Sequence, residues 1–146
     1  MKKSVSIVMC ALVAACADQT AVLYDDPNYP PENTAIVAPA PDNVGKVVIT
    51  AAGGQPVRCG VLGRNECQSV RLLPGTTILR LDYAPAAETR LAAARDMDLP
   101  INAQGGHTYH IKATVVRDGA AGQGGPRVVV QVVDKGRGEP PPTAKP

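Results

Sequence analysis

Two histidines are the first side chains in this sequence that could support metal or acid–base chemistry. His107 and His110 are the only histidines, and their H-x-x-H spacing would place both on one face of a helix. On a β-strand the same spacing places them on opposite faces, and the residues around them alternate as in a strand. The sequence therefore predicts no shared metal site, with His107 at the edge of a turn.

Hydroxyl and carboxyl groups that could support nucleophilic catalysis are few. Ser69 is the only serine beyond the N-terminal segment, and it lacks a G-x-S-x-G context. Asp96 and Asp98 fall on one face of a predicted strand, where they could pair as acids or form a solvated strand edge. The glycine-rich string 119–125 lacks the Lys-Ser/Thr pair and the helix of a phosphate-binding loop. We therefore expect no catalytic residue, no cofactor and no enzymatic activity.

The N-terminus has the pattern of an export signal. Lys2 and Lys3 precede an apolar stretch, Val5 to Val13, that is too short to span a bilayer, which needs about 20 apolar residues. The stretch ends in Val13-Ala14-Ala15-Cys16, which resembles the lipobox of bacterial lipoproteins. The resemblance implies that residues 1–15 are a cleaved signal peptide. It also implies that Cys16 carries the acyl chains of a membrane anchor.

Two points about this segment stay open. A plain secretory signal, cleaved after the alanine-rich residues 11–15, is the alternative to lipidation. In enteric-type lipoproteins an Asp directly after the cysteine marks inner-membrane retention, so Ala17 favours the outer membrane. Asp18, the position that some bacteria read instead, leaves the choice of membrane unsettled.

The remaining cysteines predict a disulfide. Cys10 leaves with the signal and Cys16 is assigned to the lipid, so Cys59 and Cys67 remain as an even pair in an oxidising compartment. Glycine and asparagine residues lie between them, as in a hairpin turn. The spacing is not C-x-x-C and has no partners with metal-ligand spacing, so we expect a structural bridge rather than a redox or metal site.

Composition divides the exported chain into three parts. Residues 16–42 contain five prolines and five acidic residues and no basic one, which predicts an extended linker that could reach roughly 80 Å. Residues 43–135 form the predicted domain. Residues 136–146 contain four prolines, which predicts a disordered tail.

The predicted domain has a period-two pattern broken at glycines and prolines. It predicts an all-β fold, a single antiparallel β-sandwich of about seven strands. Residues 86–95 have high helix propensity and could form a helical turn or an irregular strand. The expected strands span residues 44–50, 57–62, 67–73, 76–83, 97–101, 107–116 and 127–134.

Two strings in this region add a further likeness. Leu72 to Tyr83 contains a leucine-x-proline-glycine turn followed by an apolar strand, and Gly105 to Ile111 is a glycine-led strand with a tyrosine. Together they resemble small envelope β-sandwiches of the PEGA or transthyretin-like kind, although the P-x-G-A opening is absent. The resemblance implies a non-catalytic module without an assigned ligand.

These features predict a lipid-anchored protein of the bacterial cell envelope, on the periplasmic face of the outer membrane. We expect a structural or protein-interaction module whose partner is an unidentified envelope protein or the cell wall. The strand Val128 to Val133 is the expected contact if it lies on a sheet edge. A glycan-binding module and an accessory or inhibitor protein of a secretion-type machine are the alternatives. The net charge of +2, the absence of Trp and Phe and the presence of only four Tyr argue against a nucleic-acid partner.

Overall fold

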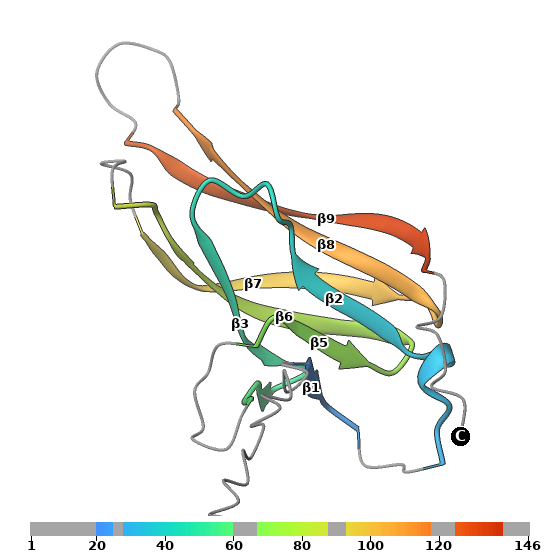
Figure 1. Ribbon diagram of the computed structural model, residues 1–146. Coiled ribbons are helices and arrows are strands. Elements are labelled where there is room, and N and C mark those ends of the chain that lie inside the picture. The colour runs from blue at the N-terminus through green and yellow to red at the C-terminus, as the bar shows by residue number, and fades with distance from the viewer. Residues whose placement is uncertain (1–19, 25–27, 60–66, 88–92, 118–124, 139–146) are drawn as a thin grey trace, which may run out of the picture.

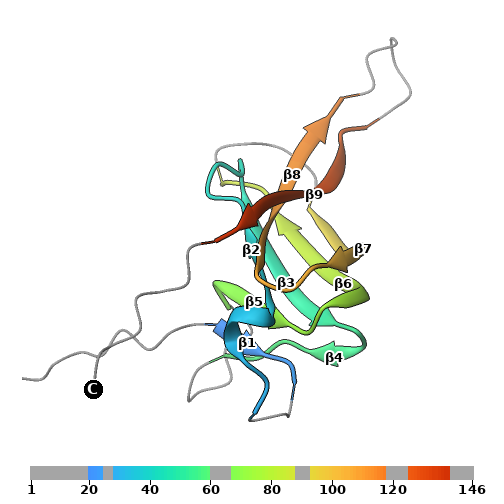
Figure 2. The same ribbon diagram turned by 90° about the vertical axis from the view of Figure 1, so that its right-hand side faces the viewer.

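The computed structural model describes residues 20–24, 28–59, 67–87, 93–117 and 125–138. Within these ranges the chain forms strands in two sheets that pack face to face, which confirms the predicted β-sandwich (Figures 1 and 2). The elements are β1 (Thr20–Val22), the 3-10 turn η1 (Pro31–Asn33), β2 (Ala35–Pro39), β3 (Lys46–Ala52), β4 (Gln55–Pro56), β5 (Ser69–Leu72), β6 (Gly75–Ala84), β7 (Ala94–Ala103), β8 (His107–Val116) and β9 (Arg127–Arg137).

The two sheets differ in strand direction. The four-stranded sheet has the order β4-β3-β6-β7 and is antiparallel throughout. The five-stranded sheet has the order β1-β5-β2-β8-β9 and is mixed, because β1 runs parallel to β5 and β2 runs parallel to β8. The prediction of a wholly antiparallel sandwich is therefore wrong for this sheet. The physical reason is that β2 enters it between β5 and β8, antiparallel to the first and parallel to the second.

Alternating apolar residues explain how the two sheets face each other. In β6, Leu79, Leu81 and Tyr83 are each at most 2% exposed, whereas Arg80 lies on the outer face. The same alternation places three residues of β8 in the core, at most 8% exposed: Tyr109, Ile111 and Ala113. Because successive strand residues point to opposite faces, this period-two pattern is enough to fix which face is buried.

The predicted linker over residues 16–42 is wrong in its described part. Thr20–Val22 is strand β1 and Ala35–Pro39 is strand β2, and both pair within the five-stranded sheet. Ala35 and Val37 are completely buried, so this segment contributes to the core. Two of the prolines that suggested an extended chain lie at element boundaries: Pro31 starts η1 and Pro39 ends β2, where a missing N–H costs least.

The C-terminal boundary also shifts. Strand β9 continues to Arg137, so the predicted domain end at residue 135 is too early and residues 136 and 137 do not belong to a tail. Gly136 has φ of 80°, a left-handed conformation that glycine adopts without strain, and it lies where the pairing of β8 and β9 shifts register. The predicted tail from residue 139 onward lies outside the described residues.

Most of the other expected strands are confirmed. The structure has β3, β5, β6, β7, β8 and β9 at the predicted places, and β8 has the predicted bounds. The strand expected over residues 57–62 does not form in its described part, because Val57 and Arg58 follow the two-residue strand β4 as irregular chain. Of the ambiguous segment 86–95, Ala94 and Arg95 belong to β7, and residues 88–92 lie outside the described residues.

Candidate functional site

The cysteines predicted to pair do so. Cys59 and Cys67 form a disulfide with a Cα–Cα distance of 5.4 Å, and Cys67 is buried against the core. Cys59 follows β4 and Cys67 precedes β5, so the bridge closes the connection that leads from one sheet to the other. The lipobox and Cys16 lie outside the described residues.

The two histidines are separated by the strand, as the alternation predicts. His107 is the first residue of β8 and its ring stacks on the buried Tyr109, with ring centroids 6.2 Å apart. His110 has the opposite parity, so its side chain leaves the outer face of the same strand. Among the residues that the structure describes, no group of three or more potential metal ligands occurs.

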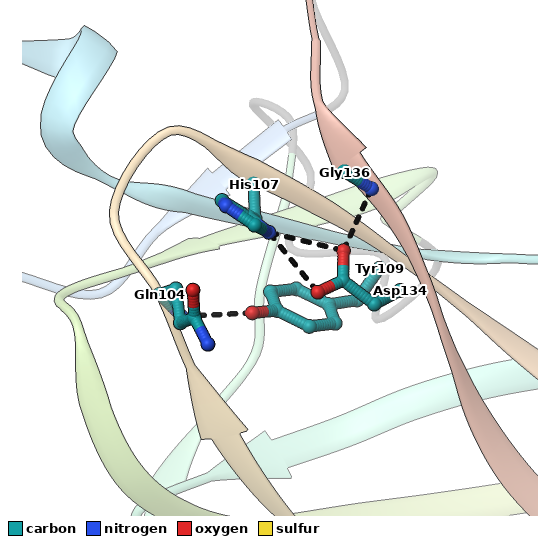
Figure 3. A network of polar contacts seen from close by, with 5 residues as sticks. All are labelled: Gln104, His107, Tyr109, Asp134 and Gly136. Atoms are coloured by element: carbon teal, nitrogen blue, oxygen red, sulfur yellow. Dashed lines mark hydrogen bonds and ion pairs between the residues drawn. The ribbon is translucent and has the colours of Figure 1, made fainter.

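His107 has a partner that its sequence position did not suggest. Its Nδ1 lies 3.0 and 3.1 Å from the two carboxylate oxygens of Asp134 in β9 (Figure 3). An ionised carboxylate only accepts hydrogen bonds, so Nδ1 carries the hydrogen. The backbone N–H of Gly136 donates to Asp134 Oδ1 at 2.7 Å. These hydrogen bonds hold the pKa of Asp134 below its ordinary value of 3.8, and the one from Gly136 has the largest effect.

A second hydrogen bond anchors the same end of β8. The backbone N–H of Gln104 donates to the hydroxyl oxygen of Tyr109 at 2.8 Å (Figure 3). The group around His107 thus connects the turn before β8, the start of β8 and the end of β9. These hydrogen bonds join strand and turn residues, so the geometry supports a structural role in holding β9 in place.

The other candidates for acid–base or nucleophilic chemistry are also engaged in strand pairing. Ser69 Oγ lies 2.7 Å from Thr20 Oγ1, across the β1–β5 pair. Asp98 Oδ1 accepts a hydrogen bond from Arg80 Nε at 3.1 Å, and Asp82 Oδ1 accepts one from the backbone N–H of Asp96 at 3.0 Å. The structure therefore does not bring Asp96 and Asp98 together as an acid pair.

One open cleft lies at the end of the sandwich where β8 finishes. Its volume is about 620 Å³, and Asp42, Val44 and Tyr83 line it together with residues 112–115 and Arg117. Lys112 Nζ lies 2.9 Å from Asp42 Oδ2, so the two charges partly neutralise each other. The hydrogen bond from Lys112 is the main reason that the pKa of Asp42 is lowered. Sequence reasoning missed this cleft, because residues 70 positions apart form it.

The edges of the two sheets offer a different kind of site. Four strands form these edges: β1 and β9 in one sheet, β4 and β7 in the other. Strands β1 and β4 have only three and two residues, which is too short to pair with a long partner strand. The two long edges, β7 and β9, therefore decide whether the fold can accept another strand.

Strand β7 has features that protect an edge. It contains Pro100, Arg95 and Asp98, and prolines and charges both oppose the addition of a further strand. Asp96 adopts a positive φ of 52° beside a register shift in the β6–β7 pair. Such an irregularity twists an edge away from flat pairing. Pro100 thus lies in an edge strand, the part of a sheet where proline is tolerated.

Strand β9 lacks these features over its central part. Between Val128 and Val133 it has no charge and no proline, and all residues but one are β-branched. The residues Val128, Val130 and Val132 pack against the core, while Val129 and Val133 are 39% and 36% exposed on the outer face. In Figure 1, β9 forms the border of its sheet, and within the described ranges only β8 pairs with it. The segment Val128 to Val133 therefore lies on a sheet edge, as its predicted role in binding requires.

Comparison of the chain with protein families, with curated proteins and with solved structures gives no match. Within the described ranges, no helix has the length and apolar character needed to cross a membrane.

Proposed function

We propose that this chain is a lipid-anchored protein of the bacterial cell envelope, and that its β-sandwich is a non-catalytic structural and protein-interaction module. The lipobox Val13 to Cys16 supports export and acylation at Cys16. The Cys59–Cys67 bridge supports an oxidising compartment, since such bridges are rare in reducing ones. The side chains of Ser69, Asp98 and His107 are hydrogen-bonded to residues of neighbouring strands, which supports the non-catalytic part of the proposal.

The unprotected edge of β9 is the observation that carries the interaction role. A long, uncharged edge presents backbone N–H and C=O groups to which an extended strand can add. The contrast with β7 makes this edge distinctive, because the same molecule protects its other long edge. The proposed mode of binding is the addition of one partner strand beside β9.

Acylation is tested at Cys16. Cells that produce the chain with radiolabelled palmitate should incorporate the label and yield the protein in the membrane fraction. The Cys16→Ser variant should lose both. Label retained in this variant, or an unlabelled wild-type chain with its starting methionine intact, would exclude the anchor.

The interaction edge is tested by site-specific photocrosslinking in cells. A photoreactive residue at Gln131, in the middle of β9, should give a discrete adduct with another protein. The same residue at Asn102, on the protected edge β7, is the matched control and should give none. Adducts at neither position, or equally at both, would contradict the edge as the binding site.

A further inference from the structure

The uncharged part of β9 lies between basic side chains. Exposed Arg127 precedes it, and exposed Lys135 and Arg137 follow it. Arg117 lies beside Arg127, because it follows Val116, the residue of β8 that pairs with Arg127. Both ends of the available edge are therefore basic.

The single acidic residue of β9 is already engaged. The carboxylate of Asp134 accepts hydrogen bonds from His107 and from the backbone of Gly136. Among the residues that the structure describes, neither Lys135 nor Arg137 has a carboxylate at ion-pair distance. The positive charge at this end of the edge is thus not neutralised by the described part of the chain.

We propose that the β9 edge binds an extended peptide strand of alternating apolar residues with acidic residues at the end that meets Lys135 and Arg137. This inference rests on the proposed function and specifies the chemistry of the partner. The backbone of the peptide would pair with β9 between Val128 and Val133. Its inward apolar side chains would extend the layer formed by the half-buried valines of this strand.

A second copy of this chain fits the edge less well. In an antiparallel pair of β9 strands related by a two-fold axis, each strand's beginning meets the other's end. With the axis at Gln131, Arg127 would lie opposite Lys135 of the copy, and like charges in directly opposed positions are unfavourable. An acid-flanked peptide replaces this repulsion with attraction.

The test uses synthetic peptides and the folded chain that carries the disulfide. Two labelled peptides have the same alternating valine–threonine centre, and one ends in glutamates while the other ends in lysines. We expect the glutamate-flanked peptide to bind about tenfold more tightly at low salt, with the difference shrinking as salt is raised. Fluorescence anisotropy measures both affinities.

Charge reversal identifies the residues responsible. Lys135→Glu/Arg137→Glu should abolish or reverse the preference. The double variant Arg58→Glu/Arg95→Glu makes the same change in net charge at exposed positions outside β9, and it should keep the preference. A glutamate-flanked peptide with a central proline should not bind, because proline cannot donate to a strand ladder.

Each contrary result has a distinct meaning. Equal binding of both flanked peptides would overturn the acidic partner and leave strand addition at β9 intact. No binding of either peptide would overturn both the partner and the proposed edge. Concentration-dependent dimerisation that Val133→Lys abolishes would assign the edge to a second copy and overturn the acidic partner.

Discussion

The side-chain amide of Asn43 pairs with the backbone of β8 as a strand residue would: its Oδ1 accepts a hydrogen bond of 2.9 Å from the N–H of Ala113. Its Nδ2 donates to the carbonyl of Ile111 at 3.0 Å. Strand β2 ends at Pro39, and the backbone N–H of Ala40 makes one further hydrogen bond to β8, at 2.9 Å from the carbonyl of Ile111. Asn43 therefore adds a second donor to that carbonyl and satisfies the N–H of Ala113, which the end of β2 would leave open.

Removing this amide should destabilise the sandwich. We expect Asn43→Ala to lower the free energy of unfolding by about 1–3 kcal/mol, because it leaves the part-buried N–H of Ala113 without its partner. Urea unfolding measures the change. Asn102→Ala, at an exposed position of β7, is the control and should change stability by less than about 0.5 kcal/mol. Equal effects of the two substitutions would contradict this role for Asn43.

Two glycines with nearly the same φ allow the cost of backbone strain to be measured separately from the cost of steric crowding. Gly45 and Gly75 have φ of 126° and 131°. A Cβ on Gly45 would lie 2.7 Å from the hydroxyl of Tyr83, whereas one on Gly75 would meet nothing within 4 Å. Both alanine variants should carry the backbone strain of about 1–3 kcal/mol. Gly45→Ala should cost about 1–3 kcal/mol more because it also crowds a packed site.

Thermal unfolding of the two variants provides the comparison. If Gly45→Ala melts at the same temperature as Gly75→Ala, then the close approach of Gly45 to Tyr83 has no energetic consequence, and the prediction fails.

The disulfide should contribute measurably to stability. On the chain-entropy estimate, a loop as short as that between Cys59 and Cys67 gives about 2–3 kcal/mol. Reductant should therefore lower the melting temperature of the wild type and have no effect on Cys59→Ser/Cys67→Ser. Two reactive thiols at these positions in the denatured, unreduced protein would show that the bridge does not form.

Stability should fall in acid in a specific window. The pKa of Asp134 is lowered by the hydrogen bonds from Gly136 and His107, and that of Asp42 by the hydrogen bond from Lys112. A carboxyl group whose folded pKa lies below its unfolded value stabilises the fold above the unfolded value. That contribution is lost as the pH falls from about 4 through the folded pKa. Urea midpoints measured between neutral pH and about pH 2 should show this decline.

The two carboxyl groups can be separated by substitution. Asp134→Asn should flatten the acid decline, and Asp42→Asn should do so independently, since the two residues belong to different hydrogen-bonded groups. Asp98→Asn is the control, because it removes an exposed carboxylate from the other sheet. An unchanged acid decline in both test variants would exclude these groups as its source.

Residue alternation and cysteine counting predicted those features of the fold that depend on residues close together in the sequence. Strict alternation from Leu79 to Tyr83 identified β6 and its buried face, and the pairing of Cys59 with Cys67 followed from counting. Strand β2 was missed because it is short and rich in small residues. Its partner in the parallel pair is β8, where Val37 lies opposite Tyr109. The sequence near residue 37 contains no pattern that indicates a pairing partner so far along the chain.

The same limit applies to the candidate sites. The charge-free character of β9 could be read from the sequence, but its edge position could not, because strand order is a property of the whole sheet. The partner of His107 is Asp134, which lies 27 residues away in another strand. A register shift between these strands sets their approach, and no periodicity in the sequence records that shift.

The incorporation of Thr20–Val22 into the five-stranded sheet changes what an anchor at Cys16 would do. Only four residue steps separate that cysteine from the first paired residue, and a fully extended chain covers at most about 14 Å over this distance. An acylated molecule would therefore lie against the headgroups, with diffusion in two dimensions and a restricted set of orientations. Strand β9 forms the edge of this sheet opposite β1, so a partner strand would add on the side away from the strand nearest the anchor.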